Sequence, residues 1–210
     1  MKKLFIMVVF ALTTLNISAQ EESSFNFHAG IGMSSVVGGD ADTKLTIAYK
    51  LGLSYDLKAA ENFYVIPGIE LVAKGFKSDN VDGAVNMTYI EVPVVAAYKF
   101  DIADGMKLVI KAGPYVAYGL FGSDLKFNNG KKINVFDKDD GFKRFDAGVL
   151  GGIGIELEQF TIGAEYSRGF VKLDSHYKQY NQAFGLVFGY KFKVIIRKFK
   201  SFDPSEMPRD

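Results

Sequence analysis

The chain has 210 residues, of which 48% are hydrophobic and 23% are charged, and it contains no cysteine. This length is enough for one domain with a sizeable barrel or sandwich. The 25 basic and 24 acidic residues nearly cancel, so nothing indicates nucleic-acid binding, which favours a basic excess on one face. Without cysteine, disulfides, thiolate catalysis and lipoprotein anchoring are excluded.

The first residues have the pattern of an export signal. Met1 is followed by Lys2 and Lys3, an apolar run covers residues 4–12, and the small residue Ala19 precedes polar sequence. The apolar run is too short to cross a bilayer as a helix, which takes about 18 residues. We therefore predict a signal peptide over residues 1–19, cleaved after Ala19. No later apolar run approaches the helical spanning length, so any membrane crossing must use strands.

From Phe25 onward, apolar and polar residues alternate with a period of two, which is typical of strands whose two faces meet different surroundings. In the first segment, Phe25 and Phe27 share one face while Asn26 and His28 share the other. The alternating segments cover residues 25–34, 45–56, 63–74, 89–100, 107–119, 144–157, 160–170 and 184–192. Most have about ten residues or more, the length that a tilted strand needs to cross a bilayer.

The connections between these segments alternate in length. Short ones cover residues 57–61, 101–105 and 158–159, and long ones cover residues 38–42, 77–86, 122–141 and 171–179. This asymmetry is typical of outer-membrane barrels, and an even strand number places both chain ends at the short-turn, periplasmic side. The sequence therefore predicts an all-β fold: an eight-stranded antiparallel up-and-down transmembrane β-barrel over residues 20–192, with a periplasmic tail over residues 193–210.

The longest connection contains Asn129-Gly130, a dipeptide that is a strong hairpin signal. We expect this loop to form a small β-hairpin. Its apolar residues Phe127, Ile133 and Val135 can contact a partner or pack on neighbouring loops, and we favour packing. The basic tail after Phe192 is either a periplasmic contact or a solvated end, and we favour the solvated end.

The polar face carries seven basic and seven acidic residues, a balance that predicts ion pairing inside the barrel. They are Lys50, Lys74, Lys99, Lys107, Lys111, Arg144 and Lys191 with Asp56, Glu70, Glu91, Asp146, Glu156, Glu158 and Glu165. We expect a structural network built from Lys50, Glu70, Lys74, Glu91, Lys99, Lys111, Arg144, Asp146, Glu156 and Glu165, in which Glu91 pairs with Lys99 or Lys111. Because eight strands enclose only enough room for their own side chains, the lumen should be filled and should not conduct.

Other polar residues are weaker candidates for chemistry. His28 is expected to be a hydrogen-bonded lumen side chain rather than a ligand. Glu91 and Glu165 can be interpreted as an acid–base pair, but ion pairing is favoured. Ser175-His176 suggests an acyl hydrolase, although neighbouring strand residues point apart and a triad needs its base aimed at its nucleophile. We expect no catalytic site and no cofactor.

Two acidic loop segments can attract calcium. They contain Asp40 and Asp42, and Asp137, Asp139 and Asp140 before Gly141. Neither fits the EF-hand spacing, because aligning Gly141 with the invariant glycine puts Phe136 and Lys138 where ligands belong. We therefore predict no metal site.

Four stretches carry a resemblance to a known family: YIEVPVVAAYKF (Tyr89–Phe100), KAGPYVAYGL (Lys111–Leu120), RFDAGVLGGIGIEL (Arg144–Leu157) and FGLVFGYKF (Phe184–Phe192). In these the chain resembles the PorT-type outer-membrane β-barrel family. The resemblance implies an eight-stranded barrel in a Gram-negative outer membrane. Most members have no known activity, and one branch is linked to protein secretion and gliding. The chain departs from the family's pattern by continuing for about eighteen residues beyond Phe192.

The sequence thus predicts an integral outer-membrane protein that acts through its surface loops in a structural, adhesive, envelope-assembly or secretion-associated role. Its expected partners are outer-membrane lipid and an envelope protein contacting the long loops or the tail. Two alternatives come from other classes. One is an outer-membrane acyl hydrolase using Ser175 and His176, and the other is a soluble lipocalin-like periplasmic carrier with its apolar face inward.

Overall fold

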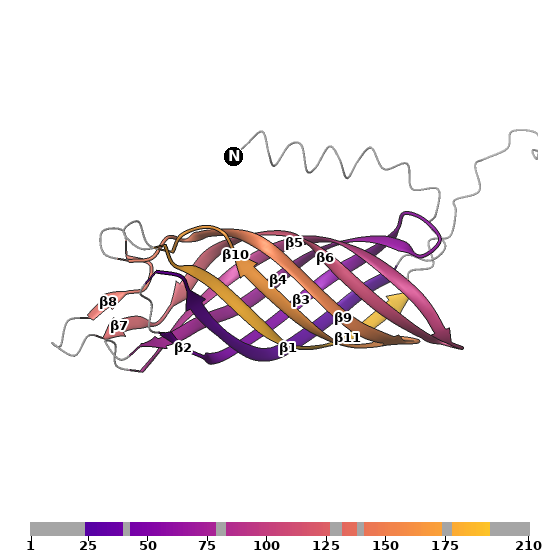
Figure 1. The fold of residues 1–210 in the computed structure, drawn as a ribbon, viewed down its shortest axis with the longest axis horizontal. Coiled ribbons are helices and arrows are strands. Elements are labelled where there is room, and N and C mark those ends of the chain that lie inside the picture. Colours follow the sequence, from indigo (N-terminus) through magenta and orange to yellow (C-terminus); the bar gives the residue numbers. More distant parts are fainter. Residues whose placement is uncertain are drawn as a thin grey trace, which may run out of the picture.

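A computed structural model describes residues 24–39, 43–78, 83–126, 132–137, 141–173 and 178–193. Eight long antiparallel strands form one closed barrel (Figure 1). They are β1 Ser24–Val37, β3 Thr46–Lys58, β4 Phe63–Ser78, β5 Ala84–Ala103, β6 Met106–Gly122, β9 Phe145–Leu157, β10 Phe160–Gly169 and β11 Tyr180–Lys193. Three short strands accompany them: β2 Thr43–Lys44, β7 Asp124–Lys126 and β8 Lys132–Asn134. The eight-stranded prediction is confirmed, and most strands extend beyond the alternating segments.

The barrel closes between its first and last long strands. Residues Phe25 and Ser34 of β1 lie opposite Phe192 and Ala183 of β11, and β4 pairs with both β3 and β5. Every long strand therefore has two hydrogen-bonded neighbours. Closure satisfies the backbone donors and acceptors internally, which a structure in lipid requires.

The two ends of the barrel differ as the connection lengths predicted. Tight turns join β5 to β6 and β9 to β10 at one end, where the Glu158 backbone N–H donates to the Gly105 carbonyl at 2.9 Å. Figure 1 shows the β7–β8 hairpin at the opposite, long-loop end. Asp124 pairs with Asn134 across that hairpin, so the predicted hairpin is confirmed, although Asn129-Gly130 lies outside the described residues.

The outer surface of the barrel is apolar. Exposed large side chains occur on all eight long strands, among them Ile31, Tyr49, Leu71, Val92, Ile110, Ile153, Ile162 and Phe188. The charged residues of the same strands are instead buried inside, including Asp56, Glu70, Lys74, Glu91, Lys99 and Lys191. This arrangement suits lipid outside and is the reverse of what a lipocalin-like carrier requires. That alternative is therefore wrong.

Within the described ranges, no helix has both the length and the apolar character needed to cross a membrane. The predicted signal peptide lies outside the described residues, as does the predicted tail after Lys193.

Candidate functional site

At the short-turn end of the lumen, two lysines and two carboxylates form a closed ring. Lys99 Nζ lies 2.6 Å from Asp56 Oδ2 and 2.9 Å from Glu156 Oε2. Lys191 Nζ lies 2.7 Å from Asp56 Oδ2 and 2.5 Å from Glu156 Oε2. The ammonium group of Lys99 also lies 4.2 Å from the centre of the Tyr64 ring. The charges balance within this group, which we call the turn-end ring.

In the middle of the lumen, five side chains form a chain of contacts. The His28 imidazole Nε2 lies 2.9 Å from Glu70 Oε1, and Lys50 Nζ lies 2.9 Å from Glu70 Oε2 and 2.6 Å from Glu165 Oε2. Lys111 Nζ lies 2.5 Å from Glu165 Oε1. This central bridge joins β1, β4, β3, β10 and β6 and so crosses the lumen. His28 is the hydrogen-bonded lumen side chain that the sequence predicted.

Toward the loops, Lys74 and Glu91 form a deeply buried pair with a separation of 2.6 Å between Nζ and Oε2. The Lys74 ammonium group lies 4.4 Å from the centre of the Tyr115 ring. The expected pairing of Glu91 with Lys99 or Lys111 is therefore wrong. Strands advance about 3.3 Å per residue, and the register sets Glu91 opposite Ala117, far from Lys111 along β6.

Two residues of the predicted network make other contacts. Asp146 Oδ2 accepts hydrogen bonds from Asn181 Nδ2 at 3.0 Å and from the Tyr115 hydroxyl at 3.3 Å. Arg144 lies at the loop end, where Nη1 donates to the carbonyls of Gly119 and Leu120 at 2.8 and 3.0 Å. Sequence reasoning missed Asn181, because its segment did not alternate clearly before residue 184.

Two further residues of the polar face lie at the turn end rather than inside the lumen. Lys107 forms a half-exposed pair with Asp101 at 3.3 Å, and Glu158 is exposed in the β9–β10 turn. The two carboxylates interpreted as an acid–base pair, Glu91 and Glu165, are engaged by different lysines. The structure does not bring these two carboxylates together as such a pair.

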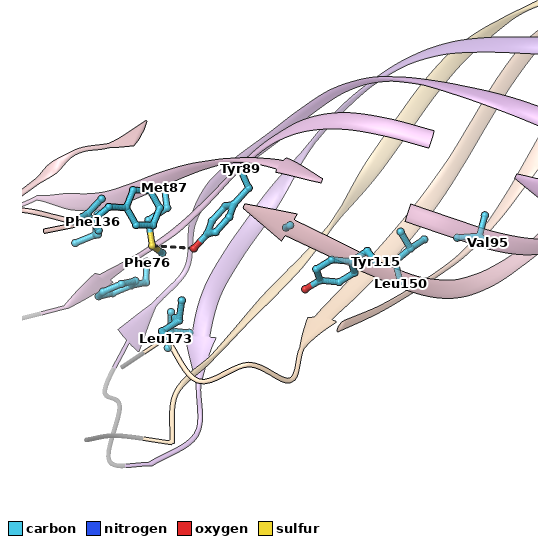
Figure 2. Close-up of a cluster of buried hydrophobic side chains, with 12 residues drawn as sticks. Phe76, Met87, Tyr89, Val95, Tyr115, Phe136, Leu150 and Leu173 are labelled. Atoms are coloured by element: carbon cyan, nitrogen blue, oxygen red, sulfur yellow. Dashed lines mark hydrogen bonds between the residues drawn. The ribbon is translucent and has the colours of Figure 1, made fainter. Parts of the chain in front are cut away.

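At the loop end, buried apolar side chains meet across the lumen in one cluster. We call Val36, Phe76, Val85, Met87, Val135, Phe136 and Leu173 the loop-end cap. They come from β1, β4, β5 and the two loops that follow β6 and β10. Figure 2 shows Phe76, Met87, Phe136 and Leu173 gathered beside Tyr89, whose hydroxyl lies 3.3 Å from the Met87 sulfur. This cap is apolar, whereas the network beneath it is charged.

Glycines of β6 make room for the loop residues of the cap. A Cβ added at Gly119 would lie 2.3 Å from Phe136 Cζ, and one at Gly122 would lie 2.3 Å from Val135 Cγ1. The Phe136 ring is held edge-on by Tyr89 at 5.8 Å and is covered by the Arg144 guanidinium at 4.9 Å. Val135 and Phe136 are only 0% and 3% exposed.

The preference for packing in this loop is confirmed for Val135, and for Ile133, which packs against the cluster. Phe127 lies outside the described residues. Sequence reasoning missed Phe136 as a packing residue. The signal available was a Val135-Phe136 pair within an otherwise polar loop.

The remaining sequence candidates receive no geometric support. Ser175 and His176 lie outside the described residues, as do Asp40, Asp42, Asp139 and Asp140. Among the residues that are described, no group of three or more His, Cys, Asp or Glu side chains has the arrangement of a metal site.

Several solved structures of other proteins are similar to this chain. Neisserial surface protein A has a TM-score of 0.51 at 11% identity, and covers 82% of this chain and 100% of its own. The outer membrane enzyme PagL has a TM-score of 0.50 at 16% identity, with 79% and 98% coverage. Ail, the attachment invasion locus protein of Yersinia pestis, has a TM-score of 0.44 at 19% identity, with 81% and 99% coverage. At these identities, the likeness to Neisserial surface protein A and to PagL shows the fold alone.

A comparison with curated proteins gives no match. A family match covers most of the chain, over residues 17–175, and its description is outer membrane protein beta-barrel domain. Together with the closed barrel, its apolar exterior and its ion-paired interior, this match places the protein in the outer membrane of a Gram-negative bacterium. The chain belongs to the outer membrane protein beta-barrel domain family.

Proposed function

We propose that this protein is a non-enzymatic, non-conducting outer-membrane barrel that acts through its loop end in a structural, adhesive or envelope-assembly role. The observation that carries the proposal is the loop-end cap. Val135 and Phe136 descend from the longest loop into the lumen and are almost fully buried there. An apolar constriction disfavours ions because they would lose their hydration without gaining partners.

The charged layers beneath the cap support the same conclusion. The central bridge and the turn-end ring hold lumen lysines and carboxylates in direct contact. Because these side chains are paired with one another, they offer no unpaired charges along which mobile ions would pass. With transport disfavoured, the surface that remains for function is the folded loop end with its β7–β8 hairpin. The loops fold onto the barrel through the cap, which gives this end a defined shape.

Planar-bilayer recording of the purified barrel tests the closed lumen. We expect no steady conductance, whereas stable, large, voltage-independent channels would overturn the proposal. A second experiment tests the loop end: residues 124–134 are replaced by a short Gly-Asn-Gly turn, leaving Val135 and Phe136 in place. In a deletion strain, this variant should insert normally but fail to restore surface attachment and detergent resistance. Full restoration would show that the hairpin is not the functional surface.

We further propose a PorT-type assignment within the family, with secretion-associated assembly as one form of the role. Its support is that two short motifs within the stretches that resemble this family, Tyr89–Pro93 in β5 and Gly113–Tyr115 in β6, lie side by side. Pro93 of β5 is opposite Tyr115 of β6, and Lys74 contacts both the Glu91 carboxylate and the Tyr115 ring. The motifs thus build one buried unit. The corresponding measurement is the amount of protein secreted by the deletion strain. It should fall relative to wild type and be restored by the wild-type chain.

The acyl-hydrolase alternative retains a direct test. PagL is described as an outer membrane enzyme, but fold likeness at 16% identity does not transfer activity. The purified barrel should release no fatty acid from lipid, with or without Ser175→Ala. Release that disappears in Ser175→Ala would overturn the non-enzymatic proposal.

A further inference from the structure

A polar group interrupts the apolar outer surface of the barrel at the loop end of β10 and β11. Tyr166 of β10 and Phe184 of β11 are exposed on this surface. Arg168 and Gln182 lie opposite each other in the register, each two residues nearer the loops, so they point outward as well. At the same end, the outer faces of β6 and β9 carry Tyr118, Leu120 and Phe145.

Gln182 holds the Arg168 side chain in place on this surface. Its Oε1 accepts hydrogen bonds from Arg168 Nη1 and from the Tyr166 hydroxyl, both at 3.3 Å. Its Nε2 donates to Ser35 Oγ of β1 at 2.9 Å. The guanidinium carbon of Arg168 lies 6.0 Å from the centre of the Tyr180 ring. Neutral groups from three neighbouring strands therefore position this cation.

The charge of Arg168 faces outward without a carboxylate beside it in the described parts of the chain. There, its hydrogen-bonded side-chain partner is the neutral amide of Gln182. A guanidinium has five N–H donors in a planar fork that matches the oxygens of a phosphate or carboxylate. Arginine is costly on the lipid face at the bilayer midplane and costs little near the interface. The position therefore fits the level of the lipid headgroups.

Two exposed lysines lie in the connection that follows Arg168. Lys172 and Lys178 are each next in sequence to one of two bonded residues, because the Leu173 backbone N–H donates to the Gln179 carbonyl at 2.9 Å. This bond holds the two ends of the connection together. Among the described residues, neither lysine has an acidic partner within ion-pair distance. We call Arg168, Gln182, Lys172 and Lys178 the outer-wall patch.

We propose that the outer-wall patch binds the phosphorylated headgroup of a lipid in the outer leaflet. The Arg168 guanidinium takes the phosphate oxygens, and Lys172 and Lys178 add positive charge above it. The acyl chains lie along the exposed side chains below, which include Tyr166 and Phe184. An apolar surface directly beneath a cationic one matches an anionic lipid better than a free anion or a protein. The inference is independent of the proposed loop-end role.

Native mass spectrometry of the full barrel in an uncharged detergent tests the proposal. The barrel is titrated with dimyristoyl phosphatidic acid, and with dimyristoyl phosphatidylcholine as a lipid of equal acyl chains and no net charge. The variants are Arg168→Gln and the double variant Lys172→Gln with Lys178→Gln. Lys77→Gln is the matched control, since Lys77 is exposed at the loop end of β4, which β3 and β1 separate from β11.

We expect wild type to bind phosphatidic acid about tenfold more tightly than phosphatidylcholine. Arg168→Gln should weaken phosphatidic acid binding by about tenfold, the size of losing a charge-assisted hydrogen bond. Lys77→Gln should leave it within about twofold, because only a general attraction between net charges changes. Equal affinity for the two lipids, unchanged binding in Arg168→Gln, or an equal loss in Lys77→Gln would each overturn the proposal.

Two further arms separate the remaining explanations. The double lysine variant leaves every strand residue unchanged and should weaken phosphatidic acid binding by about threefold or more, so it serves if Arg168→Gln does not fold. Unchanged binding in the folded double variant would overturn the patch. Inorganic phosphate at the same concentration as the lipid should not displace it, and displacement would show a free-anion site instead of a lipid site.

Discussion

Lys74 donates from Nζ to Glu91 Oε2 at 2.6 Å, and both side chains are 2% exposed. Glu70 lies directly opposite Glu91 across β4 and β5, so two carboxylates that would repel each other are neighbours. Each is neutralised by a different lysine, Lys74 for Glu91 and Lys50 for Glu70. The arrangement of lumen lysines therefore compensates a like-charge pair that the strand register creates.

Glu91→Ala should destabilise the barrel by roughly 3–5 kcal/mol, because it leaves the Lys74 ammonium group buried without its partner. The double variant Lys74→Met with Glu91→Leu should be much closer to wild type, since it removes both charges and keeps apolar volume. Urea unfolding in lipid vesicles measures both. A Glu91→Ala change below about 1 kcal/mol would mean that the pair is weak or hydrated.

Asp56→Asn should be far more destabilising than Asp101→Asn. Asp56 is buried between Lys99 and Lys191, so losing its charge leaves both lysines dependent on Glu156. Asp101 is 64% exposed and pairs with Lys107 at 3.3 Å, a surface contact worth at most about 1 kcal/mol. Urea unfolding at low and high salt measures both variants. Equal effects of the two substitutions would contradict the burial of the turn-end ring.

Gly119→Ala should expel Phe136 from the loop-end cap, because the new Cβ would lie 2.3 Å from Phe136 Cζ in a ring already fixed by Tyr89 and Arg144. Limited proteolysis of the β6–β9 loop should become faster. Phe136→Ala alone should also loosen the loop, and by the size of buried aromatic truncations it should cost about 3–5 kcal/mol.

The combination of Gly119→Ala with Phe136→Ala distinguishes a steric clash from a general weakness of the loop. The added methyl group then occupies part of the space that the ring leaves. The double variant should therefore be no more protease-sensitive than Phe136→Ala alone. Additive sensitivity would show that Gly119 serves the loop in some way other than accommodating the ring.

Ile153→Lys should destabilise the membrane-inserted barrel by about 2–4 kcal/mol, the range for a lysine on the lipid face at the bilayer midplane. Ile153 is exposed on the outer surface of β9. Ser54→Lys is the control, since Ser54 lines an internal space of the lumen that the carboxylates of Asp56 and Glu165 also line, and this position should tolerate the charge better than the lipid face. Urea unfolding in lipid vesicles measures the loss of unfolding free energy for each variant. Equal losses would contradict the assignment of Ile153 to the lipid face and Ser54 to the lumen.

Local sequence was sufficient for the barrel itself. The side-chain period of two fixed which residues point outward, since successive strand residues alternate faces whatever the global fold. Phe25 and Phe27 are accordingly exposed to the exterior while His28 is buried inside. The connection lengths determined which end carries the loops. A connection of only two residues, such as 158–159, must form a tight hairpin turn between adjacent antiparallel strands, so the long connections lie at the other end.

The sequence alone was also enough to exclude the expected ion pair between Glu91 and Lys99. Lys99 follows Glu91 by eight residues on the same strand, which at about 3.3 Å per residue places it roughly 26 Å away. No side chain bridges that distance. Lys74, in contrast, lies on the neighbouring strand β4 opposite Met87, only four residues along β5 from Glu91.

Only the tertiary structure decided which charges meet across the lumen. Lys50 and Glu165 are separated by 115 positions and become partners because the closed, staggered barrel brings β3 and β10 to face each other. The same holds for Val135 and Phe136, whose burial depends on how a long loop folds back over Gly122 and Gly119. Alternation is a property of one strand, whereas these contacts depend on closure and stagger, which belong to all eight strands together.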